Sequence, residues 1–148
     1  MAALVEDLHP VAGLELLQKS SDLQRFSRDA FDYSPVLNAR LEHCQADLVV
    51  RPSDVEAVEA LAAACFRHRV PLTLRGTGTG NYGQSVPLEG GVVMLTSGLQ
   101  KLRHLDRQTW AVTVEPGCSL RDLDQQLRRE GRQLRLLPST WRSATIGG

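Results

Sequence analysis

Several residue types and patterns that mark common protein classes are scarce or missing in this sequence. The three cysteines, Cys44, Cys65 and Cys118, are odd in number and widely spaced, which argues against a disulfide framework and against paired metal ligands. The four histidines do not cluster either. No apolar run approaches the ~20 residues that a membrane span needs. These absences favour a cytoplasmic protein with reduced thiols, no metal site and no membrane span.

Net charge is also absent. Lysine plus arginine and aspartate plus glutamate both number 17 in the 148 residues. A nucleic-acid partner would favour a basic surface, so we expect none. The segment Met1–Asp7 carries acidic residues where a signal peptide needs basic ones. The length suits one domain.

The sequence contains no Gly-Lys-Ser or Gly-Lys-Thr, which excludes a P-loop. Instead, Arg75–Gly83 reads R-G-T-G-T-G-N-Y-G and follows the apolar run Val70–Leu74. That run predicts a buried strand. Glycine leaves the backbone sterically bare, so successive amides of residues 77–83 can form an anion-binding concavity. The pattern predicts a loop that holds a pyrophosphate at the end of a strand.

Two other interpretations of this loop stay open. Gly78, Gly80 and Gly83 satisfy the G-x-G-x-x-G pattern of Rossmann domains, but that motif needs a helix beginning inside it. Pro87 and two further glycines follow instead, and the acid expected about twenty residues later has one loose candidate, Asp106. The other alternative is a glycine-rich surface turn without a ligand.

Residues Arg75–Gly83, together with Pro87, resemble the flavin loop of FAD-linked oxidases of the vanillyl-alcohol-oxidase or p-cresol-methylhydroxylase (PCMH) type. Within that family the sequence is most similar to glycolate oxidase flavoprotein subunits and D-lactate dehydrogenases. The resemblance extends from about Phe26 to Gly148. Three further patches carry it in the same order along the chain: Arg51–Val55, Val114–Gly117, and Pro138–Thr140 with Ala144–Gly148.

The resemblance implies an α+β fold with an N-terminal β-α-β subdomain and part of a second α/β subdomain. Residues 1–40 would be an N-terminal helical extension, and residues 41–148 the N-terminal part of a PCMH-type FAD-binding domain. Because the last motif lies inside that domain in the family, we expect a truncated domain. The substrate would then bind through a missing cap domain, and other oxidase subunits are possible partners.

By the same resemblance, FAD is the cofactor. A histidine tethers the flavin in some relatives, but Thr79 occupies its position here, so non-covalent binding is expected. Trp141 and Arg142 depart from the small polar residues common in the family. No catalytic residue is implied. The residues expected to contact the cofactor are Arg75, Gly76, Thr77, Gly78, Thr79, Gly80, Asn81, Tyr82, Gly83, Gln84, Pro116, Gly117, Pro138, Ser139, Thr140, Thr145, Ile146, Gly147 and Gly148.

Local patterns predict the remaining elements. Leucines within residues 1–30 favour one or two short helices, and residues 29–35 a turn. Ser53 and Glu56 form a capping box before a helix with an apolar face of Val55, Val58, Leu61, Ala62, Cys65 and Phe66. We also expect a second helix after Ser119 that ends near Gly131. Strands are expected at 46–50 and 91–96, a hairpin at 102–114, and a strand at 133–137.

The sequence therefore predicts the FAD-binding part of a flavin-dependent oxidoreductase. The intact enzyme would oxidise a small 2-hydroxy acid or alcohol by hydride transfer to FAD. The alternative is a non-enzymatic nucleotide-binding module, or a truncated remnant without its own activity.

Overall fold

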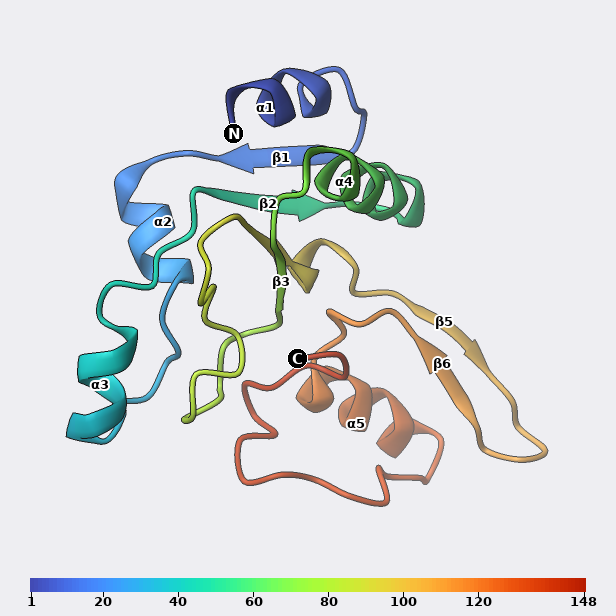
Figure 1. Cartoon of the computed structure of the whole chain (residues 1–148). Helices are drawn as coiled ribbons and strands as arrows, with labels where there is room; N and C mark the ends of the chain where they lie inside the picture. Colours follow the sequence, from blue (N-terminus) through green and yellow to red (C-terminus); the bar gives the residue numbers. More distant parts are fainter.

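A four-stranded sheet forms the larger part of the computed structural model, which describes residues 1–148 (Figure 1). The strand order is β1-β2-β4-β3. Strands β2 and β3 both run parallel to β4, which lies between them, and β1 runs antiparallel to β2. The strand bounds are Leu14–Leu17 for β1, Leu48–Pro52 for β2, Leu72–Arg75 for β3 and Val92–Leu95 for β4.

Both faces of this sheet are covered. Because side chains alternate along a strand, Val92 and Met94 of β4 point to one face and Val93 and Leu95 to the other. Helices α1 (Ala2–Leu8) and α4 (Val55–His68) pack on the first face, and α2 (Ser20–Phe26) packs on the second. All four residues of β4 are buried, so β4 is the centre of the core.

A smaller unit follows. Strands β5 (Leu102–Leu105) and β6 (Val112–Val114) form an antiparallel hairpin, and helix α5 (Leu120–Arg129) packs beside it. We call residues 1–99 the sheet lobe and residues 100–148 the hairpin lobe. The predicted hairpin is confirmed. The predicted helix start is confirmed too, because the Ser119 side chain accepts a hydrogen bond from the amide of Asp122.

The N-terminal helical expectation is wrong for residues 14–17. Leu14 and Leu16 alternate with Glu15, a period of two that suits a strand, and this segment pairs with β2 as β1. A short helix, α3 (Pro35–Leu41), begins where only a turn was expected, with Ser34 as its cap. The division of the chain at residue 40 stays a prediction, although α1 and β1 share the core of β2.

Helix α4 begins one residue later than the predicted capping box. Asp54, not Ser53, is its N-cap, and the Asp54 carboxylate accepts a hydrogen bond from the amide of Ala57 at 2.8 Å. The buried face is also rotated, because α4 packs against both α1 and the sheet. The helix buries Ala57, Leu61, Ala64 and Cys65, whereas Val55, Ala62 and Phe66 are exposed.

Two strand predictions also need correction. Strand β3 is an edge strand rather than a buried one, because β4 takes the central position, and Leu74 is 57% exposed. Residues 133–137 form no strand. No strand pairs with this segment; the amide of Leu134 donates to Asp124 Oδ1 instead, and Leu136 is exposed. The predicted strands at 46–50 and 91–96 are confirmed within a few residues.

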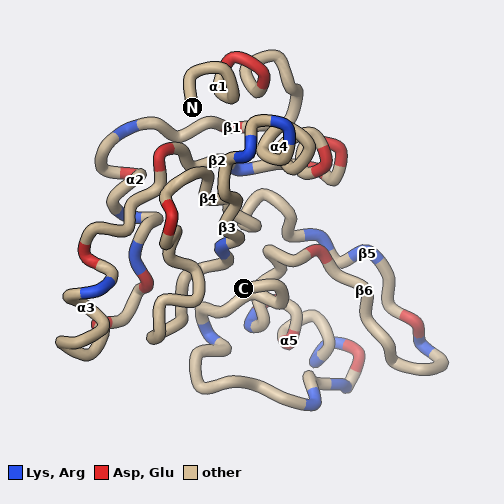
Figure 2. Tube along the Cα trace, viewed as in Figure 1, with Lys and Arg blue, Asp and Glu red and all other residues tan.

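Charged side chains are unevenly distributed over the two lobes. Basic residues gather on α5 and in the segment after it, whereas acidic residues lie on α1 and at the start of α4 (Figure 2). The three cysteines are free. No helix combines the length and the apolar character needed to cross a membrane.

Candidate functional site

The glycine-rich loop connects β3 to β4. It leaves the carboxyl end of a parallel strand, as predicted, and runs through residues 76–91 without any helix. A Rossmann phosphate site needs a helix that begins inside the motif. That interpretation of Gly78, Gly80 and Gly83 is therefore wrong.

Six consecutive amides of this loop make no hydrogen bond within the chain. The N–H groups of residues 76–81 have neither a backbone nor a side-chain acceptor. The next two amides are already used, because Tyr82 N–H donates to Gln84 Oε1 and Gly83 N–H donates to Asp29 Oδ2, both at 3.1 Å. The amides free for an anion are therefore those of residues 76–81, a narrower set than the sequence predicted.

Arg75, the last residue of β3, holds the start of the loop by hydrogen bonds from its side chain. Its side chain is buried, and its guanidinium donates to Ser85 Oγ at 3.0 Å and to the carbonyl of Arg28 at 2.5 Å. The same group lies 3.7 Å from the Asp29 carboxylate. Burial lowers the pKa of Arg75, and the charge of Asp29 opposes that shift. The guanidinium therefore donates its hydrogen bonds to groups of the protein.

Two glycines of the loop have no room for a side chain. Gly78 has φ +70°, and a methyl group there would lie 2.0 Å from the Arg75 guanidinium. A methyl group on Gly76 would lie 2.5 Å from Thr145 Oγ1 and 2.6 Å from the Cα of Gly148. Glycine is required at these positions by the left-handed backbone of Gly78 and by the close approach at Gly76.

The C-terminal motif meets the glycine loop. Gly147 N–H donates to the carbonyl of Pro116 at 2.8 Å, and Ile146 N–H to the carbonyl of Cys118 at 3.0 Å. Together with the approach of Gly76 to Gly148, these contacts bring three predicted segments to one place: the loop, Pro116–Gly117 and Thr145–Gly148. The hydroxyl of Thr145 is buried there without a hydrogen-bond partner. A buried polar atom of this kind is rare unless a ligand or water satisfies it.

The fourth predicted segment, Pro138–Thr140, is not joined to the others by any hydrogen bond. It forms a turn of its own, in which Trp141 N–H donates to the carbonyl of Pro138 and Ala144 N–H to that of Thr140. Arg142 is exposed and stacks on Trp141. The contacts of Pro138, Ser139 and Thr140 with a cofactor stay a prediction.

Sequence reasoning missed the contribution of Asp29 and Ser85. The Asp29 carboxylate is fully buried and accepts hydrogen bonds from Ser85 Oγ at 2.7 Å and from Gly83 N–H. The one indication in the sequence was Arg75, because a charged residue at the end of an apolar strand needs a partner of opposite charge if it is buried. Nothing in the sequence says that the partner comes from residue 29.

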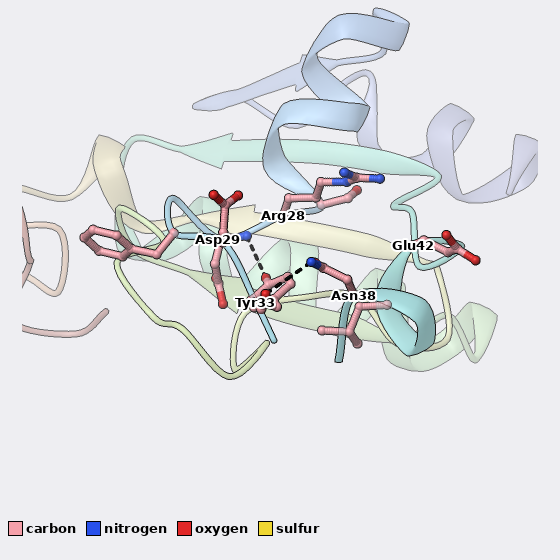
Figure 3. Close-up of a pocket in the computed structure, with 9 residues that line it drawn as sticks. Arg28, Asp29, Tyr33, Asn38 and Glu42 are labelled. Carbon is pink, nitrogen blue, oxygen red and sulfur yellow. Dashed lines mark hydrogen bonds between the residues drawn. The ribbon is translucent and has the colours of Figure 1, made fainter. Parts of the chain in front are cut away.

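A cavity of about 280 Å³ opens next to this network, between the segment after α2 and helix α3 (Figure 3). Arg28, Asp29, Tyr33, Asn38 and Glu42 line it. Tyr33 Oη accepts a hydrogen bond from Asp29 N–H at 2.9 Å, and burial raises the pKa of Tyr33. None of the residues predicted to contact FAD lines this cavity.

Comparison with known proteins identifies the class. A sequence model of the FAD binding domain matches residues 46–148, which include the loop and the segments that meet it. The chain belongs to this family of FAD-binding domains, and FAD is its cofactor. The match covers the glycine loop but begins after Asp29.

Individual relatives agree with the family. The glycolate oxidase subunit GlcD of Bacillus subtilis is 31% identical over 102 residues, which are 69% of this chain and 22% of that protein. The probable mitochondrial D-lactate dehydrogenase of Danio rerio is 40% identical over 85 residues, 57% of this chain and 17% of that protein. The chain therefore spans about a fifth of the length of these relatives.

A solved structure shares the fold. The crystal structure of p-cresol methylhydroxylase with substrate bound superposes with a TM-score of 0.77 at 22% identity, covering 99% of this chain and 28% of that one. The expected α+β fold of the PCMH type is confirmed.

Proposed function

We propose that this chain is the FAD-binding part of a flavin-dependent oxidoreductase that oxidises a small 2-hydroxy acid or alcohol. Bound FAD supplies the chemistry of that reaction by accepting a hydride, and the protein binds and orients the cofactor. The substrate class is supported by the names of two relatives, a glycolate oxidase subunit and a D-lactate dehydrogenase.

One observation carries the cofactor site: the run of unpaired amides at residues 76–81, directly after a parallel strand. The pyrophosphate of FAD carries two negative charges. A hydrogen bond to a charged group contributes about 1.5–3 kcal/mol, so three or four of these amides would dominate the affinity for this part of FAD. The unpartnered hydroxyl of Thr145 lies at the edge of the same loop and supplies one further group.

The remaining proposed contacts surround this loop. Thr77, Thr79 and Asn81 offer side-chain hydrogen bonds, and Tyr82, which is 74% exposed, offers a ring for stacking. Pro116–Gly117 and Ile146–Gly148 let the backbone pass close to the flavin. Because Thr79 stands where a tethering histidine would be, the flavin is bound without a covalent link and should be released by acid precipitation.

The surroundings of the domain are part of the same proposal. The substrate would be bound by a cap domain, and other oxidase subunits are candidate partners. We also propose a cytoplasmic location, which the three free cysteines support.

The experiment is a titration of the purified protein with FAD and, separately, with riboflavin, which lacks the pyrophosphate. Flavin fluorescence reports binding. We expect riboflavin to bind at least ~100-fold more weakly, because it cannot use the loop amides. Equal affinities would reject the loop as the pyrophosphate site.

The substrate class is tested with the natural full-length protein, loaded with FAD, under anaerobic conditions. Addition of D-lactate or glycolate should bleach the visible flavin absorption, and L-lactate serves as the control for D-lactate. Bound FAD that no 2-hydroxy acid or alcohol reduces would favour the alternative, a nucleotide-binding module without activity.

A further inference from the structure

Asp29 is the most deeply buried charged group near the loop. Its side chain has no exposed surface, although it lies in an irregular segment between α2 and α3 rather than in a core element. Burying a carboxylate in this way is costly unless hydrogen bonds and an opposite charge compensate it. The hydrogen-bond partners of the Asp29 carboxylate therefore indicate the role of this buried charge.

All of those partners belong to the glycine loop or to its base. Asp29 Oδ1 accepts from Ser85 Oγ and lies 3.7 Å from Arg75 Nη1, and Asp29 Oδ2 accepts from Gly83 N–H. Arg75 also donates to Ser85, so Ser85 bridges the two charges. The neighbouring amide of Ala30 donates to the carbonyl of Gly78 at 2.7 Å.

These contacts fix the loop at three points: its start at Arg75, its middle at Gly78 and its end at Gly83. Between them lie the unpaired amides of residues 76–81. The carbonyl and the N–H of a trans peptide point in opposite directions, so the bond from Ala30 to the Gly78 carbonyl directs the Thr79 N–H away from Ala30. The network therefore sets the direction in which the free amides point.

We propose that Asp29 is a positioning residue for the FAD loop: its buried carboxylate holds Arg75, Ser85 and Gly83 so that the intervening amides face the cofactor. The inference rests on the proposed function. It also assigns a role to a segment that precedes the matched domain, because residues 27–34 lie outside 46–148.

The energetics favour this role over a purely structural one. A buried ion pair contributes little net stability, and an apolar pair of similar volume often serves the fold as well. A network with several donors, in contrast, fixes geometry. Asp29 should therefore matter more for the shape of the loop than for the stability of the sheet.

Asp29→Asn is the test. Asp47→Asn, at an exposed aspartate, is the control for the loss of one carboxylate–amide hydrogen bond. Asp47 is also an aspartate outside helices and strands, and its carboxylate accepts from Gly91 N–H at 2.7 Å, at the opposite end of the same connection. It does not contact residues 75–85. Both variants, and Ser85→Ala, are made in the natural full-length protein and are compared at the same interval below their melting temperatures, so that the less stable variant is assayed at the lower temperature.

Two measurements decide. Hydrogen exchange of the two amides bonded within this network, Gly83 N–H to Asp29 and Ala30 N–H to the carbonyl of Gly78, is recorded without FAD. It should become ~10-fold faster or more in Asp29→Asn and stay unchanged in Asp47→Asn. The dissociation constant for FAD should rise ~10- to 100-fold in Asp29→Asn, less in Ser85→Ala, and under ~3-fold in Asp47→Asn.

Each outcome bears on the proposal. Equal losses of FAD affinity in Asp29→Asn and Asp47→Asn, or unchanged loop exchange in Asp29→Asn, would overturn it. Should Asp29→Asn fail to fold, Ser85→Ala still decides, because it breaks the bridge but keeps the Asp29 carboxylate opposite the buried Arg75 guanidinium. If the wild-type protein bound no FAD, the proposed function would fail, and the exchange data alone would then decide whether Asp29 positions the loop.

Discussion

The two lobes are stabilised in different ways. The sheet lobe has a cluster of nine buried core residues on one face of the sheet and four on the other, whereas the hairpin lobe has a cluster of only three. The hairpin lobe compensates with buried carboxylates, Glu115 and Asp124, that accept hydrogen bonds from backbone amides. On the side of the sheet lobe, the loop is therefore supported by a large apolar core. On the side of the hairpin lobe, it is supported by a small core and by hydrogen bonds to buried carboxylates.

The lobes meet through backbone rather than through apolar side chains. Gly117 N–H donates to the carbonyl of Leu99 at 2.7 Å, and Gly76 lies against Gly148. The unpaired amides and the Thr145 hydroxyl lie at this junction. Small residues at the junction keep the backbone accessible, and four predictions test this comparison of the lobes.

The largest effect is expected at the junction itself. In Gly117→Ala the added methyl group would lie 1.9 Å from the carbonyl oxygen of Thr96, and a backbone atom cannot move away cheaply. We expect a loss of about 3 kcal/mol or more in the free energy of unfolding, measured by urea denaturation. Gly80→Ala is the control, because its methyl group would meet the ends of two side chains, Gln84 Oε1 at 2.5 Å and Asp29 Oδ2 at 3.3 Å, and no backbone atom. Equal stability of the two variants would refute the tight junction.

Truncation of one buried leucine in each lobe compares the two cores directly. Leu61 and Leu123 are both almost completely buried. Leu61→Ala should cost about 3–4 kcal/mol, because the other eight residues of its packed cluster cannot collapse into the cavity. Leu123→Ala should cost about 2 kcal/mol, since its smaller cluster can close over the space. A larger loss for Leu123, measured by the same denaturation, would reverse our comparison.

The loop itself should be more important for the cofactor than for stability. Gly78→Ala places a methyl group against the Arg75 guanidinium and displaces the loop, so FAD should bind ~10- to 100-fold more weakly. Gly131→Ala has nearly the same positive φ, but nothing lies within 4 Å of its methyl group. It should lose about 1 kcal/mol of stability and keep its FAD affinity. Fluorescence titration distinguishes the two.

The smallest effect is expected on the stability of the protein at low pH. Hydrogen bonds from Arg128 and from the amide of Leu134 lower the pKa of Asp124 below its ordinary value of 3.8. The folded state therefore favours the ionised carboxylate. Its full contribution to the free energy of unfolding is present when the pH is above the ordinary pKa of 3.8. It is lost as the pH falls through the lower, folded pKa. Asp124→Asn should show a weaker fall of melting temperature below pH ~4 than wild type. Identical pH profiles would contradict this role.

Much of the fold could be predicted because local patterns determine it. The hairpin, the start of α5 at Ser119 and the buried strand β4 all follow from turn residues, caps and apolar runs. The errors lie where distant segments compete. The apolar run at residues 70–74 does not show that β4 takes the central position in the sheet and leaves β3 at the edge. The leucines at 14–17 are compatible with a helix, and only the pairing with β2 makes this segment a strand.

The site divides in the same way. Glycines and threonines in Arg75–Gly83 indicate a bare loop after a strand, and the structure leaves six amides there unpaired. The sequence could not tell that Tyr82 and Gly83 donate within the chain, or that Arg75 points into the protein. The Gly83 bond and the burial of the Arg75 charge depend on Asp29, which lies more than forty residues away in the sequence and has no local pattern of its own. Tyr82 N–H donates to the nearby Gln84.

The glycine loop is also the crossover between two neighbouring parallel strands. Such connections usually contain a helix, but here β3 reaches β4 through residues 76–91 alone. Strand β4 lies between β2 and β3, so the sheet is incomplete until this connection has closed. The loop therefore has the shape described here only when β4 is paired with β3, so capture of an anion by the loop requires the completed sheet. Recovery of flavin binding after dilution from denaturant would consequently time the completion of the sheet.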